Sequence, residues 1–190
     1  MLPQARPAPR RKAGSVPRCW LMTDARNAEA LANIAARMPP RSAIVIRAFA
    51  LPTRGRTALI RRLRHIARAR GHMLIWSGTV CPSGYDGRHG AARRRDDGFL
   101  MMPVHDPREA VEARRHRADA VLVSPVHHTR SHPGAPTLKV RGFARLAKAV
   151  RCQAIGLGGM DAKKYRALRN HGACGWAAID GWMSSGVVSR

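Results

Sequence analysis

The sequence has few acidic and few aromatic side chains. Only 11 of the 190 residues are Asp or Glu, against 35 Lys or Arg, which gives a formal net charge of +24. A surface of this charge attracts nucleic acid and other polyanions by counterion release, whatever the protein evolved to bind. The three Phe and two Tyr residues do not alternate with the arginine runs, as a platform for stacking bases would require. We therefore expect non-specific polyanion binding without evolved base readout.

Long apolar runs and closely spaced cysteines are also absent. No segment approaches the ~20 consecutive apolar residues that cross a bilayer, so we expect no membrane partner. Residues 1–18 are rich in Pro and Arg and lack the apolar core of a secretory signal, which predicts a flexible basic arm on a cytoplasmic protein. Without a C-x-x-C pair or a secretory context, reduced thiols and no cysteine metal site are expected. The cysteines are Cys19, Cys81, Cys152 and Cys174.

The rest of the chain, residues 19–190, alternates short apolar runs with segments of helical period. This alternation is typical of βα units around a parallel sheet. The eight runs predicted to form strands are Trp20–Thr23, Ala43–Arg47, Met73–Trp76, Gly87–His89, Leu100–Val104, Ala120–Val123, Ala154–Leu157 and Trp176–Ile179. We therefore predict an α/β protein with one (βα)8 TIM-barrel domain over residues 19–190.

Helix signals lie between several of these strands. Asp106, followed by Pro107 and Glu109, is typical of a capped helix N-terminus, and Asp161 is expected to cap another helix. Barrels of this class typically need at least ~200 residues, so the predicted barrel is short and has a reduced last helix. An open sheet of the flavodoxin kind is the structural alternative. One helix is predicted from the shared face of Leu59, Ile60, Leu63, Ile66 and Ala67.

Glycines follow the last two predicted strands. Gly158 and Gly159 come after the seventh strand, and Gly181 comes after the eighth. Barrel enzymes often hold phosphate in these two loops, where glycine lets backbone N–H groups approach phosphate oxygens. We therefore expect a phosphate-binding site here. A plain tight turn is the alternative interpretation of the Gly-Gly pair.

The motifs at the predicted strand ends, taken in chain order, resemble those of thiamine phosphate synthases and their thiazole tautomerase relatives. The motifs are Leu21-Met22-Thr23-Asp24, Asp86-Gly87-Arg88-His89-Gly90, Val104-His105 with Glu109-Ala110, Ala118-Asp119-Ala120 running to Ser124-Pro125-Val126 and Thr129, Leu157-Gly158-Gly159-Met160, and Gly175 to Ile179. The resemblance implies a barrel protein of thiamine biosynthesis whose partner is a small phosphorylated heterocycle. For the synthase it implies a Mg²⁺-assisted displacement, in which the nitrogen of a thiazole phosphate replaces the pyrophosphate of a hydroxymethylpyrimidine ester.

The resemblance also implies which residues bind phosphate. Thr129 and Ser131 match two hydroxyl residues that bind phosphoryl oxygens in the family, and His132 takes the place of a lysine. A histidine fills that role when protonated or as a neutral donor, because its ordinary pKa is about 6.5 and that of lysine about 10.4. Arg47 matches the arginine of the family's Arg-Glu-Lys signature, and Ser77 stands where the synthase has an asparagine.

The carboxylates that hold Mg²⁺ in the synthase have no clear counterpart in this sequence. Gly78 stands where the first aspartate is expected, and Arg93 and Arg94 lie near the place of the second. Carboxylate oxygens are the usual ligands of Mg²⁺. Mg²⁺ is thus the cofactor that the family implies, while no metal-binding residue is predicted here.

Asp180 is a second departure from the synthase pattern. With Ile179 it follows the eighth strand, where the family has a small hydroxyl residue beside the thiazole phosphate. A carboxylate at this place would repel that phosphate unless His132 or an Arg neutralised it. This argues against an unaltered synthase.

The tautomerase branch also lacks the metal carboxylates, since one positioned acid–base group can move a proton without a metal. Its catalytic histidine aligns with Pro125 of this chain. His127 and His128 follow, and on an extended segment only one of them would face the site. The candidate catalytic residues are therefore His127, His128 and His132. A metal site built from the same three is not expected, because this Pro-flanked loop is not predicted to be helical.

Two further histidines end predicted strands. His89 is the last residue of the weakest strand, Gly87–His89, and His105 follows the fifth. We expect both to tie loops together through hydrogen bonds rather than to take part in catalysis.

Three functions follow from these observations. The leading hypothesis is a thiamine phosphate synthase family protein that binds a phosphorylated thiazole or pyrimidine with a divergent active site. The first alternative is a thiazole tautomerase-like isomerase. The second is a non-catalytic barrel whose basic surface binds nucleic acid or an acidic partner. The sequence leaves open whether the chain forms a homodimer.

Overall fold

Eight parallel strands close into a barrel in the computed structural model, which describes residues 16–78, 81–90, 98–130 and 134–183. The strands are β1 (Cys19–Met22), β2 (Ala43–Ile46), β3 (Met73–Ser77), β4 (Gly87–His89), β5 (Phe99–Val104), β6 (Ala120–Val123), β7 (Gln153–Leu157) and β8 (Ala173–Ala178). Each strand pairs with the next along the chain, and β8 pairs with β1, where Leu21 lies opposite Ala178. This closure confirms the predicted TIM barrel and excludes the open sheet. Of the predicted basic arm, residues 1–15 lie outside the described residues.

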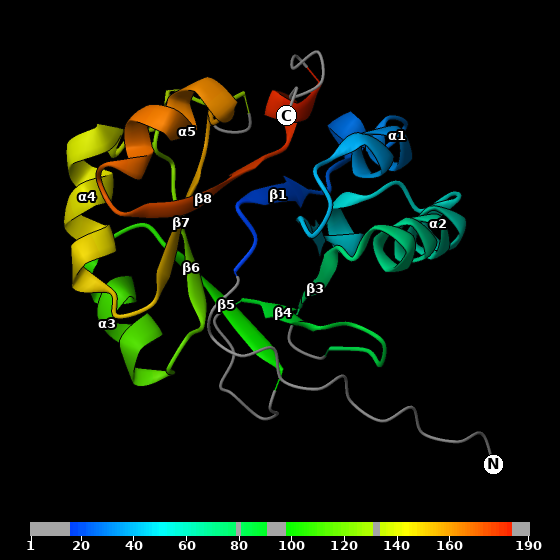
Figure 1. Ribbon diagram of the computed structural model, residues 1–190, viewed down its shortest axis with the longest axis horizontal. Helices are drawn as coiled ribbons and strands as arrows, with labels where there is room; N and C mark the ends of the chain where they lie inside the picture. Colours follow the sequence, from blue (N-terminus) through cyan, green and yellow to red (C-terminus); the bar gives the residue numbers. More distant parts are fainter. Residues whose placement is uncertain (1–15, 79–80, 91–97, 131–133, 184–190) are drawn as a thin grey trace.

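The helices cover the outside of the barrel in two groups. In Figure 1, α1 and α2 lie on one side, and α3, α4 and α5 lie on the opposite side. The elements are α1 (Leu31–Arg37), α2 (Arg56–Arg70), α3 (Pro107–Arg115), α4 (Lys139–Ala149) and α5 (Ala162–Arg169), with single 3₁₀ turns η1 (Ala25–Asn27), η2 (Ala48–Ala50) and η3 (Asp180–Trp182). The described part of the chain thus has fewer α-helices than a full (βα)8 barrel. After β8, the described residues form only η3, in agreement with the predicted reduction of the last helix.

Strand residues alternate between the barrel interior and the layer under the helices. Trp20 and Met22 of β1 belong to the interior cluster, while Leu21 between them packs with the helix-facing core. Both faces of the sheet are therefore buried, which is why the strands read as unbroken apolar runs. The interior cluster consists of Trp20, Met22, Ala43, Val45, Met73, Ile75, Met101, Ala120, Leu122, Ile155 and Ala177.

Aspartates fix the start of two helices at the carboxyl ends of the strands. Asp106 accepts a hydrogen bond from the N–H of Glu109, and Asp161 accepts one from the N–H of Lys164 at 2.8 Å, so both predicted caps are confirmed. The Glu109 carboxylate accepts the N–H of His105, which ties the residue before the cap to the first turn of α3. These caps hold the loops that follow β5 and β7 in place.

The predicted limits of the strands agree with the structure to within one residue at each end, except at β8. This strand begins at Ala173, three residues before the predicted Trp176. The residues Ala173, Cys174 and Gly175 have small side chains that give no strand signal by themselves. Ala173 and Gly175 pair with Ala154 and Ile155 of β7, and the register shift between these two residues leaves Cys174 out of the pairing.

Two expectations about the whole chain can be compared with the fold. Among the described helices, none is both long and apolar enough to span a bilayer. All four cysteines carry free thiols, and each is half-buried, although the sequence predicts mostly buried thiols. Burial raises the pKa of Cys19 and of Cys152 to about 11, so both stay protonated at neutral pH.

Candidate active site at the carboxyl ends of the strands

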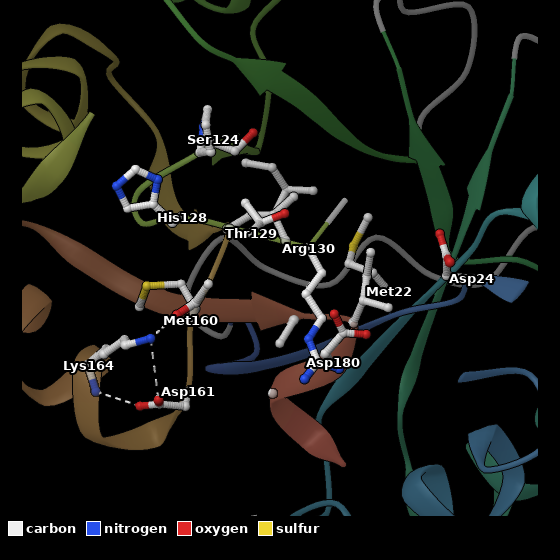
Figure 2. Close-up of a pocket in the computed structure, with 18 of the residues that line it drawn as sticks. Met22, Asp24, Ser124, His128, Thr129, Arg130, Met160, Asp161, Lys164 and Asp180 are labelled. Carbon is white, nitrogen blue, oxygen red and sulfur yellow. Dashed lines mark hydrogen bonds and ion pairs between the residues drawn. The ribbon is translucent and has the colours of Figure 1, made fainter. Parts of the chain in front are cut away.

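A pocket of about 1460 Å³ opens at the carboxyl ends of the strands, where the loops after the strands meet (Figure 2). The predicted site residues that line it are Arg47, Ser77, His128, Thr129, Gly158, Gly159, Ile179 and Asp180. His127 is not among the lining residues, so of the two adjacent histidines His128 is the one in the pocket wall. The predicted Ser131 and His132 lie outside the described residues.

The turn after β7 requires both of its glycines. Gly158 and Gly159 have φ angles of +94° and +59°, a region that favours glycine. A Cβ atom on Gly158 would meet Pro125, and one on Gly159 would meet the carbonyl oxygen of His128. Pro125 and His128 belong to the loop after β6, and this loop also donates hydrogen bonds to the turn. The N–H of Val126 donates to the Leu157 carbonyl at 2.9 Å, and the N–H of His127 donates to the Gly158 carbonyl at 3.1 Å. The two loops thus form one rigid wall.

This wall presents backbone donors to the pocket. Within the described residues, the N–H groups of Gly158 and Gly159 donate to no other protein group, although both residues line the pocket. Successive unpaired N–H groups in a turn form a concave anion site. The geometry therefore fits the phosphate-binding role predicted for these glycines.

Lys164 places a cation beside the glycine turn. Its ammonium group donates to the carbonyl of Gly159 and lies 3.7 Å from the carboxylate of Asp161, which caps the same helix. Figure 2 shows Lys164 and Asp161 together at one side of the pocket and Asp24 at the other. Lys164 was not among the predicted site residues. Its position in the first turn of the helix after a Gly-Gly pair is the sequence signal that marks it.

At the other side of the pocket, Arg26 joins two carboxylates. Its Nε atom lies 2.8 Å from Asp24, and its Nη1 atom lies 3.2 Å from Asp180. Arg47 adds a second cation at 3.2 Å from Asp24. Partial burial alone would raise the pKa of Asp24, but hydrogen bonds from Arg26, with the charge of Arg47, hold it below its usual value. The arginine that neutralises Asp180 is therefore Arg26 from the loop after β1.

The charged residues of the pocket lining are mainly basic. An excess of cations in a concave site raises the local concentration of anionic ligands. The pocket therefore favours a phosphorylated ligand over a neutral one. The six cations are Arg26, Arg47, Arg130, Lys163, Lys164 and Arg166, and the three carboxylates are Asp24, Asp161 and Asp180.

The described residues do not fit the Mg²⁺ site that the family resemblance implies. Asp24 and Asp180 are held by Arg26, and Asp161 caps α5 and contacts Lys164. Gly78, directly after β3, stands where the resemblance implies the first metal carboxylate. Within the described residues, no three His, Cys, Asp or Glu side chains are placed to hold a metal ion. We therefore derive no step that depends on a metal.

His89 occupies a special position in the pocket wall. Its Nδ1 atom is fully enclosed and has no hydrogen-bond partner in the described structure, although the residue lines the pocket. Burial lowers its pKa to about 4, so the imidazole is neutral at pH 7. His105 instead binds the carboxylate of Glu109 at 2.7 Å, which ties its loop to α3 as predicted. Because it is enclosed in this way, the unpartnered Nδ1 of His89 is not open to a ligand unless its neighbours shift, whereas His105 lines the same pocket with a half-exposed side chain.

A comparison with family sequence patterns decides the classification. A sequence model described as thiamine monophosphate synthase matches residues 87–181, half of the chain.

This chain belongs to the thiamine monophosphate synthase family.

Solved structures of the thiamine monophosphate synthase family share the fold. The thiamine phosphate pyrophosphorylase of Pyrococcus furiosus is similar at 19% identity with a TM-score of 0.69, covering 90% of this chain and 89% of that chain. The thiamine phosphate pyrophosphorylase of Bacteroides thetaiotaomicron is similar at 14% identity with a TM-score of 0.56, covering 92% and 89%. A 3-hexulose-6-phosphate synthase also matches, at 12% identity with a TM-score of 0.59, covering 90% and 93%. Among curated protein sequences, none matches this chain.

Proposed function

We propose that this member of the thiamine monophosphate synthase family binds a phosphorylated thiazole or pyrimidine in the pocket and acts on it with a divergent active site. The observation that carries the proposal is the turn at Gly158 and Gly159, whose N–H groups have no acceptor in the described chain. These donors line a pocket with twice as many cations as carboxylates. Backbone N–H groups beside a lysine are a recurring arrangement for phosphate.

The phosphate is assigned to the glycine side of the pocket. There it would accept hydrogen bonds from Gly158 and Gly159, with Lys164 as the nearest cation of α5. Thr129 and Arg130 line the same pocket from the loop after β6. The heterocycle would then extend across the barrel mouth toward His89 and Ser77, which lie at the ends of β4 and β3. This orientation keeps the phosphate away from the carboxylate of Asp24.

A tautomerase-like proton transfer is the second candidate function. It is favoured by His128, which lines the pocket, and by the engagement of each described pocket carboxylate with a cation. An imidazole can take a proton from one atom of a bound heterocycle and return it to another. His128 is the candidate for this role, and it is exposed enough to meet a ligand.

Calorimetric titration with thiazole phosphate tests the binding step. We expect saturable binding that weakens about tenfold in Lys164→Met, because a charge-assisted hydrogen bond contributes about 1.5 kcal/mol or more. Lys148→Met, on α4 at the far end of the barrel, removes the same charge and is expected to bind like the parent protein. Absence of saturable binding of thiazole phosphate and of hydroxymethylpyrimidine pyrophosphate would refute the proposal.

Turnover assays separate the two reactions. Formation of thiamine phosphate from both substrates with Mg²⁺ would support the synthase-like reaction. Proton exchange on a thiazole carboxylate phosphate, lost in His128→Asn without a change in affinity, would support the isomerase. Binding without either reaction would contradict both catalytic assignments and leave a ligand-binding protein.

A further inference from the structure

We propose that the end of the barrel opposite the active-site pocket carries a second anion site, which binds the phosphate backbone of a nucleic acid. The proposal rests on a second pocket, on the cations around it and on the absence of stacking groups in its wall. It does not depend on the ligand of the first pocket.

The second pocket has a volume of about 560 Å³ and lies at the amino ends of β6 and β7. Its floor is apolar, from Ala113, Ala118 and the carbon atoms around Cys152, and four arginines complete its wall. Figure 1 shows that α3 packs beside α4 at this place. The full lining is Val111, Ala113, Arg114, Arg115, Arg117, Ala118, Arg151 and Cys152, without a carboxylate.

The direction of the helices explains the position of only some of the four arginines that line the second pocket. The helices of a barrel run back against the strands, so their last turns lie at this end, and cations there stabilise a helix through its dipole. Arg114 and Arg115 stand in the last turn of α3 and fit that explanation. Arg117 and Arg151 lie beyond the ends of α3 and α4, in the loops that lead to β6 and β7. Their convergence on one hollow therefore needs another reason.

The cationic surface continues around the same end of the barrel. Exposed arginines and lysines occupy the last turns of the other helices, a loop that follows one of them, and the position before β1. A pocket for a small anion would not need this extension, whereas a polyanion would contact it. The additional residues are Arg18, Arg37, Arg41, Arg68, Lys148 and Arg169.

The described carboxylates at this end already have partners. Asp86 accepts the N–H of Leu74 at 2.8 Å, and Asp119 accepts the N–H of Leu100 at 2.9 Å. Glu112 lies 2.8 Å from Arg115, which leaves the cations of the surrounding surface in large excess.

The chemistry of the lining favours a phosphate backbone over other polyanions. Guanidinium groups bind phosphate oxygens through paired N–H donors. The lining offers no aromatic ring for a base to stack on and no hydroxyl or amide side chain for base readout. Of the described large apolar side chains that are strongly exposed, only Val111 lines this pocket. A single valine offers too little exposed apolar area for insertion into a lipid surface. Sequence-independent binding of duplex nucleic acid is the mode that remains.

Fluorescence anisotropy with a 20-base-pair duplex tests the proposal on the full chain. The variant Arg114→Glu, Arg117→Glu, Arg151→Glu changes the pocket, and Arg61→Glu, Arg62→Glu, Arg141→Glu makes the same charge change on the helical shell. We expect at least a tenfold loss for the pocket variant at ~50 mM salt and less than a threefold loss for the control. The slope of log affinity against log salt should fall by about 3 in the pocket variant alone, at ~0.9 per lost phosphate contact. Equal losses in the two variants, or no binding by the parent protein, would overturn the proposal.

Alkylation gives a local readout that needs no substitution. A bound duplex should slow alkylation of Cys152, which lines the pocket, and leave Cys81, which lies in the loop between β3 and β4 and outside the pocket lining, unchanged. Equal protection of both thiols contradicts the location. Binding to vesicles of phosphatidylserine and phosphatidylcholine, stronger than to the duplex and lost in the same pocket variant, would assign the surface to a membrane and overturn the nucleic-acid assignment.

Discussion

The guanidinium of Arg26 lies 3.2 Å from the carboxylate of Asp180, although 154 residues separate them in the chain. The same arginine also binds Asp24 at 2.8 Å. Arg26 follows β1 and Asp180 follows β8, and these are the two strands whose pairing closes the barrel. One side chain therefore links the loops on both sides of the closure and offsets the charge of a carboxylate that faces the ligand pocket.

Replacement of Arg26 by Ala should weaken the binding of thiazole phosphate. Without the guanidinium, the Asp180 carboxylate would repel the phosphate. Because Arg26 and Asp180 are each about one-third exposed, with side-chain exposures of 34% and 31%, water screens this repulsion. We expect about a fivefold rise in Kd, near 1 kcal/mol, measured by calorimetry.

The double variant Arg26→Ala, Asp180→Ser should recover most of this affinity, because it removes the repelling charge as well. Arg54→Ala, a loop arginine outside the pocket lining, serves as the control for loss of net charge. A double variant no better than Arg26→Ala would show that Arg26 acts on the ligand directly.

Replacement of Gly159 by Ala should destabilise the fold and abolish phosphate binding. The residue has φ +59°, and its new Cβ would overlap the carbonyl oxygen of His128. Gly55→Ala is the matched control, since Gly55 has φ +74° and open space around the new Cβ. We expect about 1 kcal/mol of lost unfolding free energy at Gly55 and about 2–4 kcal/mol at Gly159, measured by urea unfolding. Similar losses at both sites would mean that the turn has room to adjust.

The unfolding free energy should fall as the pH drops from about 6.5 to 4. The His89 imidazole takes up its proton near pH 6.5 in the unfolded chain but, because of burial, only near pKa 4 in the folded chain. In this window the unfolded state binds more protons, so stability decreases with decreasing pH, by up to about 3 kcal/mol. Denaturant unfolding of the parent protein and of His89→Asn across this range measures the effect.

A smaller pH dependence should persist in His89→Asn. Burial also lowers the pKa of His72, whose ring accepts the N–H of Ser42 and whose Nε2 atom lies 2.9 Å from the Ala35 carbonyl oxygen. This residue acts in the same direction as His89. Replacement of the exposed His65 by Asn is the control and should leave the profile of the parent protein unchanged. An unchanged profile in His89→Asn would contradict the assignment to His89.

The sequence predicts the barrel well because each strand is buried on both faces and therefore appears as a local apolar run. Even the short β4, Gly87–His89, has the predicted limits. The glycines of the β7 turn are equally visible, since their backbone requirement is a property of two adjacent residues. Local patterns of this kind are sufficient for the architecture and for one wall of the pocket.

The electrostatic arrangement of the site is beyond such local patterns. The pairing of Arg26 with Asp180 depends on closure of the barrel between the first and last strands. The enclosure of His89 Nδ1 depends on side chains from other loops, so a histidine predicted only to tie loops together is found with an unused nitrogen in the pocket wall. The arginines around Cys152 come from two separate loops and one helix end. Each of these features exists only once distant segments have met.

The filled interior of the barrel determines how the two pockets can be occupied together. Large side chains such as Trp20, Met101 and Ile155 pack along its axis with no exposed surface, so the strands enclose no passage from one mouth to the other. A ligand at one end cannot displace a ligand at the other by direct contact. A ternary complex with one heterocycle and one duplex per chain is therefore sterically allowed, and each occupant should bind with unchanged stoichiometry in the presence of the other.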